Sequence, residues 1–186
     1  MQDKLKLFNH FDQFMKRVLP YMLLSAIMSC HLKFENNRIS GYSKLPSLNL
    51  LYTDSLTVFN TNKIPEGNPT ILIYFSPDCE HCQAETQDLL TNMNSLKNVQ
   101  LYFITTATII ELKKYCQDFH FEQYNNIIAA KDYQYDFYRI YKVTSFPYLV
   151  IYNENKELVK LYKGETGIAR IVNAIQSPVS RITIAK

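Results

Sequence analysis

Two cysteines, Cys79 and Cys82, stand two residues apart in the segment FSPDCEHCQAE. His81 lies between them, and acidic residues stand before, between and after them. Cysteines at this spacing can be a pair of zinc ligands, a structural disulfide, or a dithiol that exchanges electrons. Which of these chemistries applies depends on the elements that position the pair.

The pair lies where a strand passes into a helix. TILIYF, residues 70–75, is continuously apolar, which predicts a strand buried on both faces. From Glu80 to Leu96, apolar residues recur at three- and four-residue spacing, which predicts a helix. The unpaired N–H groups of a first helical turn stabilise a thiolate. We therefore expect Cys79, at the helix tip, to be exposed and to attack disulfides, and Cys82 to be covered and to resolve the mixed disulfide.

The rest of the chain alternates strand and helix patterns. Together with the composition, this order predicts one α/β domain with a central mixed sheet flanked by helices. The 186 residues are 47% hydrophobic, and the net charge of +3 comes without a basic, aromatic-rich segment, so nucleic-acid binding has no support. The predicted elements are an N-terminal β-hairpin in 46–59, strands in 99–105 and 125–132, helices in 107–120 and 135–143, a hairpin in 148–164 and a closing helix in 167–175.

The N-terminal segment reads as an export signal followed by a tether. From Met15 a basic pair leads into a short apolar run that ends at Cys30, typical of a secretory signal too short to span a bilayer. We predict a signal segment in 1–29 (with a true start possible at Met15), a flexible tether in 30–44 and a folded domain in 45–186. IMSC resembles a bacterial lipobox, which predicts lipidation of Cys30 and a periplasm-facing, membrane-anchored protein of the cell envelope.

Three features together resemble a known family. The CEHC pair after a buried strand, the pattern C-x-x-C-x-x-E and the segment VTSFPYLVIY are similar to the thioredoxin-like fold of the TlpA/ResA-like thiol–disulfide oxidoreductases of bacterial envelopes. The resemblance implies an extra helix and strand, for which residues 106–130 are the candidates. It also implies an enzyme that needs no cofactor. Its partners would be cysteine-containing protein substrates and a membrane-bound electron donor.

The resemblance assigns roles to further residues. It implies that the Phe146–Pro147 bond is cis and that substrate peptides lie along the backbone at these two residues. It places Glu85 beside the dithiol, as a proton carrier or a residue that tunes the thiol pKa. His81 favours the thiolate and the neighbouring acids oppose it, which predicts an intermediate to reducing couple. The buried acid of thioredoxins is missing, because Ile73 occupies that position.

Three other functions remain open. A zinc site would use Cys79, Cys82, Cys116 and His120, although the gap between the halves is long for a compact module and no metal is expected. A peroxiredoxin would need a proline where this chain has Leu72. A thioredoxin-like binding module would dock partners without turnover. Cys116 is expected to be a packing residue.

Overall fold

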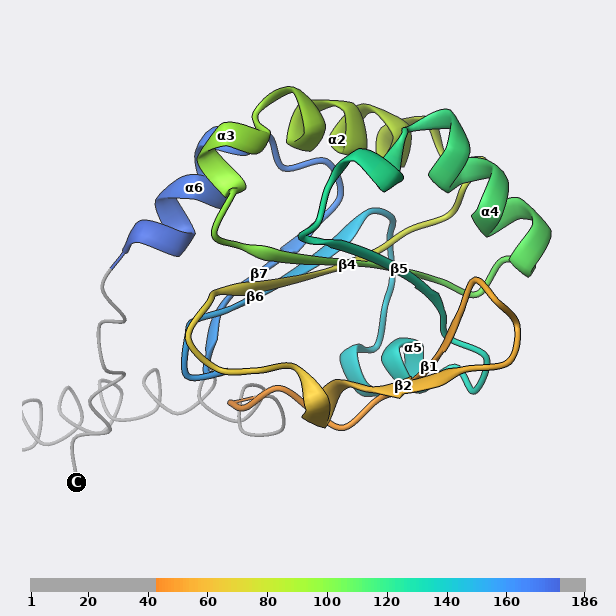
Figure 1. Ribbon diagram of the computed structural model, residues 1–186. Coiled ribbons are helices and arrows are strands. Elements are labelled where there is room, and N and C mark those ends of the chain that lie inside the picture. Colours follow the sequence, from red (N-terminus) through yellow and green to blue (C-terminus); the bar gives the residue numbers. More distant parts are fainter. Residues whose placement is uncertain (1–42, 178–186) are drawn as a thin grey trace, which may run out of the picture. The chain divides into compact units, whose positions relative to one another are not determined.

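The computed structural model describes residues 43–177, which form one seven-stranded sheet in the order β2-β1-β5-β4-β3-β6-β7 (Figure 1). Strands β3, β4 and β5 run parallel, whereas β1 and β6 run antiparallel to their neighbours, so the sheet is mixed. The strands are β1 (Asn49–Tyr52), β2 (Val58–Asn60), β3 (Thr70–Tyr74), β4 (Gln100–Thr105), β5 (Ile127–Lys131), β6 (Tyr148–Tyr152) and β7 (Leu158–Lys163).

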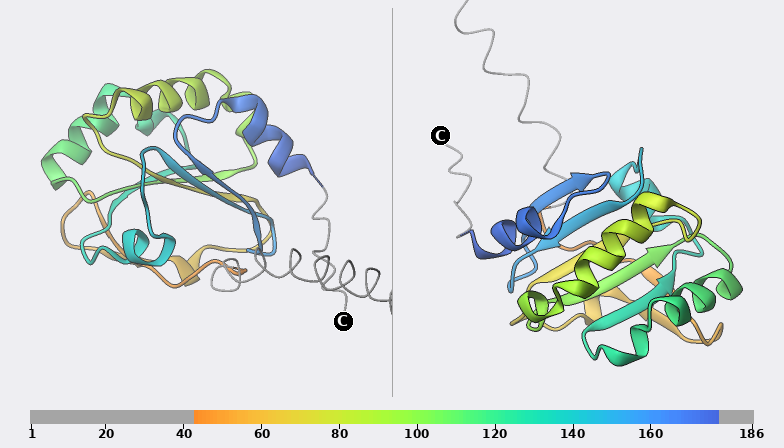
Figure 2. Two further views of the ribbon diagram at one scale, coloured as in Figure 1. Left: turned by 180° about the vertical axis from the view of Figure 1, so that it is seen from behind. Right: turned by 90° about the horizontal axis from the view of Figure 1, so that it is seen from above.

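Helices cover both faces of the sheet. One face carries four of them and the other carries α5, as Figures 1 and 2 show. The helices are α2 (Glu80–Thr91), α3 (Met93–Leu96), α4 (Ile109–Asp118), α5 (Asp136–Tyr141) and α6 (Ile168–Gln176), with short 3₁₀ turns η1 (Thr61–Lys63) and η2 (Phe121–Gln123). Because successive strand residues point to opposite faces, the central strands must be apolar on both.

The central strand β3 shows why its sequence lacks polar alternation. Ile71 and Ile73 pack in the core beneath α2, α4 and α6, while Leu72 and Tyr74 pack in the core that contains α5. All four side chains are buried. A strand with a core on each side has no solvent-facing position, which explains the continuous apolar run.

The directions of the strands place the loop before Cys79 and the loop before Tyr148 at the same end of the sheet. The parallel strands β3, β4 and β5 all end there, and the antiparallel β6 begins there, with Tyr148 paired to Tyr74. We call this end the cysteine end, because Cys79 follows β3 directly. Loops at the carboxyl ends of parallel strands are where α/β proteins build their sites.

The sequence-based fold is confirmed: an α/β thioredoxin-like architecture with an N-terminal hairpin of β1 and β2. Residues 106–130 supply the additional helix α4 and strand β5. The predicted helix from Glu80 to Leu96 is interrupted at Asn92 (φ −106°, ψ 22°), whose side chain donates hydrogen bonds back to Asp88 and ends α2 there.

The predicted signal segment, the tether before residue 43 and Cys30 lie outside the described residues. Within residues 43–177, no helix combines the length and apolar character that crossing a bilayer requires.

Candidate active site

The two cysteines occupy the start of α2. Cys79 is the N-cap residue (φ −86°, ψ 114°), and its carbonyl accepts the N–H groups of Cys82 and Gln83 at 3.0 Å each, which begins the helix. Cys79 is partly exposed and Cys82 is buried. Both are free thiols, and the neighbouring Cys79 contributes to raising the pKa of the Cys82 thiol. Two cysteines at this spacing on the first turn of a helix can close into a reversible disulfide.

Burial determines the ionisation of Cys82. It raises the pKa of the Cys82 thiol far above its ordinary value, and the contact with Cys79 raises it further; a backbone hydrogen bond at Ser76 opposes the shift. Cys82 is therefore protonated at neutral pH and must lose a proton before it can attack a sulfur atom. The two cysteines differ in access as the sequence predicts.

Glu85 is a buried carboxylate one turn after Cys82, on the same face of α2. Its Oε2 accepts the backbone N–H groups of Thr166 (2.6 Å) and Gly167 (3.3 Å) in the loop before α6. Its Oε1 is buried and has no hydrogen-bond partner. Burial raises the pKa of Glu85, and the two N–H groups oppose the rise. Glu85 is 1% exposed, so it is not a solvated helix glutamate.

Two further side chains of α2 contact the same loop. Asp88 Oδ2 accepts the N–H of Ile168 at 2.7 Å, so it caps the start of α6 from another helix. His81 Nδ1 lies 3.0 Å from Glu165 Oε2 in an exposed pair. Since His81, Glu85 and Asp88 recur at four- and three-residue spacing, one side of α2 positions the whole β7–α6 loop.

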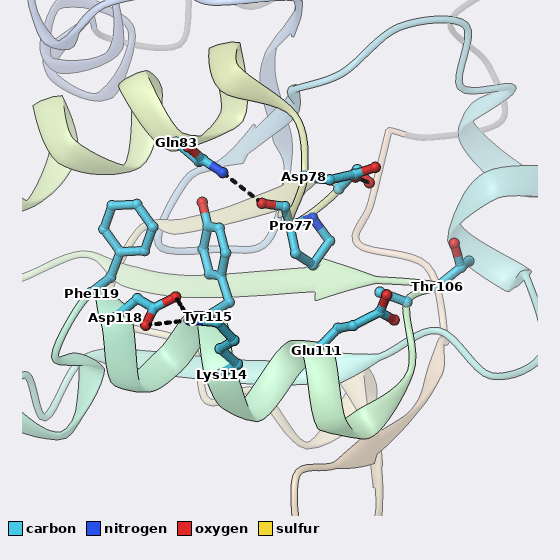
Figure 3. Close-up of a pocket in the computed structure, with 11 residues that line it drawn as sticks. Pro77, Asp78, Gln83, Thr106, Glu111, Lys114, Tyr115, Asp118 and Phe119 are labelled. Carbon is cyan, nitrogen blue, oxygen red and sulfur yellow. Dashed lines mark hydrogen bonds and ion pairs between the residues drawn. The ribbon is translucent and has the colours of Figure 1, made fainter.

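A groove of about 630 Å³ opens on the other side of α2, between the segment that precedes Cys79 and α4. Figure 3 shows Tyr115 rising from α4 toward α2 within this groove. Gln83 closes one wall by donating to the carbonyl of Pro77 at 2.8 Å. The lining residues are Ser76, Pro77, Asp78, Gln83, Thr106, Ala107, Glu111, Lys114, Tyr115, Asp118 and Phe119.

Tyr115 connects the inserted helix α4 to the dithiol. Its hydroxyl lies 2.7 Å from Thr86 Oγ1 and donates to the carbonyl oxygen of Cys82 at 3.3 Å. The side chain is 3% exposed. The apolar spacing of residues 107–120 predicts a buried face on this helix, but nothing local indicates which backbone group the hydroxyl contacts. The sequence alone therefore does not identify Tyr115 as part of the site.

The Phe146–Pro147 peptide bond is cis, as the resemblance implies. It lies at the cysteine end, immediately before Tyr148, which pairs with Tyr74 at the end of β3. The Phe146 ring stacks on the Tyr74 ring with centroids 5.7 Å apart and remains 38% exposed. Phe146 is therefore accessible next to the strand that leads into the cysteines, whereas Pro147 is buried.

The residues of the possible zinc site, Cys79 and Cys82 with Cys116 and His120, do not lie together in the structure. Cys116 lies beside a separate hollow that includes Tyr52 and Phe121, and burial raises the pKa of its thiol to about 11. His120 Nδ1 faces Glu122 Oε1 at 3.4 Å. Among residues 43–177, no three His, Cys, Asp or Glu side chains are placed to hold a metal ion.

Comparison with known proteins decides the family. Residues 61–177, more than half of the chain, match the family model of the thioredoxin-like domain. The chain belongs to the thioredoxin-like family. The match includes the CEHC pair and the Phe146–Pro147 segment, and it confirms that the resemblance to the thioredoxin-like family is correct. No curated protein sequence is similar enough to match.

Solved structures share this thioredoxin-like fold at low identity. Mycobacterium tuberculosis DsbF has a TM-score of 0.59 and 12% identity, over 73% of this chain and 94% of that one. A secreted M. tuberculosis disulfide oxidoreductase homologous to Escherichia coli DsbE has a TM-score of 0.56 and 17% identity, over 68% and 92%. A peroxiredoxin-like protein from Aquifex aeolicus has a TM-score of 0.54 and 16% identity, over 70% and 82%.

Because the fold alone hosts several chemistries, the site residues must decide the function. The thioredoxin-like domain with its Cys79–Cys82 pair is consistent with a thiol–disulfide oxidoreductase.

Proposed function

We propose that this protein is a thiol–disulfide oxidoreductase that acts on cysteine pairs of other proteins, preferentially as a reductase or in disulfide exchange. The observation that carries the proposal is the asymmetry of the dithiol: Cys79 is partly exposed at the tip of α2, and Cys82 is buried one turn further along the same helix. An accessible attacking thiol with a covered partner is the arrangement that a two-step exchange requires.

In the reducing direction, the Cys79 thiolate attacks one sulfur of a substrate disulfide. The substrate S–S bond breaks, one substrate thiolate leaves, and a mixed disulfide joins Cys79 to the substrate. Cys82 loses its proton and attacks the Cys79 sulfur, which expels the second substrate thiolate. The substrate gains two electrons and two protons, and Cys79 and Cys82 become a disulfide that an external dithiol donor must reduce.

Glu85 supports the second step in this proposal. Cys82 starts as a buried thiol, so a base must take its proton. Glu85 lies on the same helix face, and its Oε1 is buried with no competing hydrogen bond. Burial raises the pKa of this carboxylate, which makes it a stronger base than a solvated glutamate. His81 lies at the rim, paired with Glu165, where it adds positive charge beside the dithiol when protonated.

We propose that substrates approach along Phe146 and Pro147, beside the exposed Phe146 side chain at the cysteine end. The electron donor is proposed to be a membrane-bound dithiol protein of the cell envelope. Support for export comes from the sequence before Cys30 and from a structural neighbour that is described as secreted. Mass spectrometry of the mature N-terminus is expected to show a lipidated Cys30, and an unmodified Cys30 would contradict the anchor.

The test of the oxidoreductase is trapping. Cys82→Ser removes the resolving sulfur, so disulfide-linked complexes with substrates should accumulate on Cys79 and disappear on reduction. Cys79→Ser is the matched control and should trap nothing, because the remaining thiol is buried. Reduction of insulin disulfides by the wild type, with a dithiol as donor, measures turnover. Equal trapping by both variants would contradict the division of roles between the cysteines.

A thioredoxin-like module that binds partners without turnover is the alternative function. This alternative predicts that the protein does not reduce insulin disulfides although its dithiol is intact, and that it still binds its partners when both cysteines are replaced. The measurement that separates the two functions is therefore the same trapping experiment, run with a Cys79→Ser/Cys82→Ser control.

A further inference from the structure

Most of the exposed aromatic side chains among residues 43–177 fall in one stretch of the chain. Of the seven large apolar side chains that are exposed among residues 43–177, four fall between residues 133 and 146. They are Tyr133 (36% exposed), Tyr135 (55%), Tyr138 (48%) and Phe146 (38%). A cluster of this kind, unlike scattered single residues, marks a contact surface.

Topology places these aromatics at the cysteine end. Tyr133 follows the end of β5, which runs parallel to β3 and β4, so it leaves the sheet at the same end as the segment to Cys79. Phe146 immediately precedes Pro147 at the start of the antiparallel β6. Tyr135 is the N-cap residue of α5, and Tyr138 lies in the first turn of that helix.

A buried ring joins the two ends of this surface. Tyr74 stacks on Phe137 of α5, with centroids 4.4 Å apart and planes within 2°, and on Phe146 at 5.7 Å. Its hydroxyl donates to Asp132 at 3.3 Å. The start of α5 and the segment at Phe146 therefore share one rigid aromatic support, so the exposed rings above it keep fixed positions.

The Tyr135 side chain is more than half exposed and does not cap α5. Tyr135 has a left-handed backbone (φ 59°, ψ 28°), which costs free energy for any residue with a Cβ and suits glycine or asparagine better. The Tyr135 side chain makes no cap hydrogen bond. The Asp132 carboxylate caps α5 instead, by accepting the N–H groups of Asp136 and Phe137 at 2.8 and 3.0 Å. A strained, half-exposed tyrosine without a structural task suggests a role in binding.

Charge at this surface is balanced. Asp136 and Arg139, the charged residues of α5, form an ion pair with each other. The two charges within α5 therefore neutralise each other. Tyrosine and phenylalanine rings on a rigid support favour apolar and aromatic side chains.

We propose that Tyr135, Tyr138 and Phe146 form a docking surface for aromatic side chains that flank the reacting cysteine of a protein substrate. The proposal rests on the proposed function and names its substrate class: extended, aromatic-rich segments around a cysteine, as an unfolded or partly folded protein exposes them. The occupant follows from continuity, because a chain that lies along Phe146 and Pro147 with its sulfur at Cys79 passes beside this surface.

The test uses two peptides that differ only beside their cysteine. One carries phenylalanine on both sides and the other carries serine, and each has thionitrobenzoate linked to its cysteine sulfur. Attack by Cys79 on the peptide sulfur joins the peptide to Cys79 and releases the coloured thiolate, which is the better leaving group. Hydroxyethyl disulfide, which is too small to reach the tyrosines, measures the dithiol itself.

The variant is Tyr135→Asn/Tyr138→Ser, in which asparagine suits the left-handed backbone. We expect the wild type to prefer the phenylalanine peptide by about tenfold and the variant to lose most of that preference. Reaction with hydroxyethyl disulfide should be the same in both proteins. Leu56→Ser is the matched control, since Leu56 is 87% exposed on the turn after β1, toward the amino end of β5. It should keep the wild-type preference.

Four results would overturn the docking surface. They are no preference in the wild type, an unchanged preference in the variant, an equal loss with hydroxyethyl disulfide, and a wild-type dimer that the variant converts to a monomer in sedimentation. Failure of the proposed function looks different, because the wild type would then react with none of the three disulfides.

In that case, the binding of a phenylalanine peptide that has serine in place of its cysteine is measured. Binding weakened about fivefold in the variant sustains the surface, and unchanged or absent binding ends it.

Discussion

Replacement of Glu85 by alanine should destabilise the fold, and the structure sets the size of the effect. The Glu85 carboxylate accepts the backbone N–H groups of Thr166 and Gly167, and Thr166 is only 8% exposed. Leaving a buried donor without an acceptor costs roughly 1–3 kcal/mol. Because the Gly167 bond is long at 3.3 Å and contributes less, we expect Glu85→Ala to lower the free energy of unfolding by about 2–4 kcal/mol.

Glu85→Gln separates the hydrogen bonds from the charge. The glutamine carbonyl can accept the same N–H groups, so its cost at acidic pH should stay below about 1 kcal/mol. Burial, together with the nearby Asp88 and Glu165, raises the pKa of Glu85 in the folded protein. The unfolded chain then releases this proton first, at about pH 4.3, so the folded state holds more protons above that pH and wild-type stability falls as pH rises toward the folded pKa. Glu85→Gln should lack this decline.

The assay is urea unfolding of the wild type and both variants at about pH 4 and about pH 7. Relative to the wild type, Glu85→Gln should become more stable between the two pH values, while Glu85→Ala stays destabilised at both. Glu80→Ala is the matched control, because Glu80 is an exposed acid on the same helix and should change stability by no more than about 0.5 kcal/mol. An alanine variant within that range, or a glutamine variant that keeps the wild-type pH slope, would refute the reasoning.

Two further predictions concern the surroundings of the dithiol. Tyr115→Phe removes a buried hydroxyl from Thr86 and from the Cys82 carbonyl, so it should cost about 1–2 kcal/mol in urea unfolding, and a loss below about 0.3 kcal/mol would contradict the contact. Lys142→Gly should raise the free energy of unfolding by roughly 0.5 kcal/mol, because Lys142 is exposed and ends α5 with a left-handed backbone at φ 50°. Glycine removes the strain of that conformation, and this gain should exceed the loss from the greater conformational entropy of the unfolded variant. A lower melting temperature for the variant would contradict this prediction.

Local pattern was enough to predict the fold class and the dithiol. The apolar run of residues 70–75 is typical of a strand with a core on each side, and the spacing that follows it predicts a helix that begins at the cysteine pair; the structure has both. Both statements depend on residues that are neighbours in the chain. For the same reason the exposed and buried positions of Cys79 and Cys82 followed from one helical turn.

The surroundings of the dithiol depended on tertiary structure, because their contacts join residues far apart in the chain. The sequence suggested that Glu85 acts near the cysteines, but its hydrogen bond to Thr166 spans 81 residues and no periodicity encodes that partner. Tyr115 reaches the Cys82 carbonyl across 33 residues for the same reason. Tyr135 shows the limit most clearly: its spacing fits an amphipathic helix, and only the sheet topology decides that its exposed ring lies at the cysteine end.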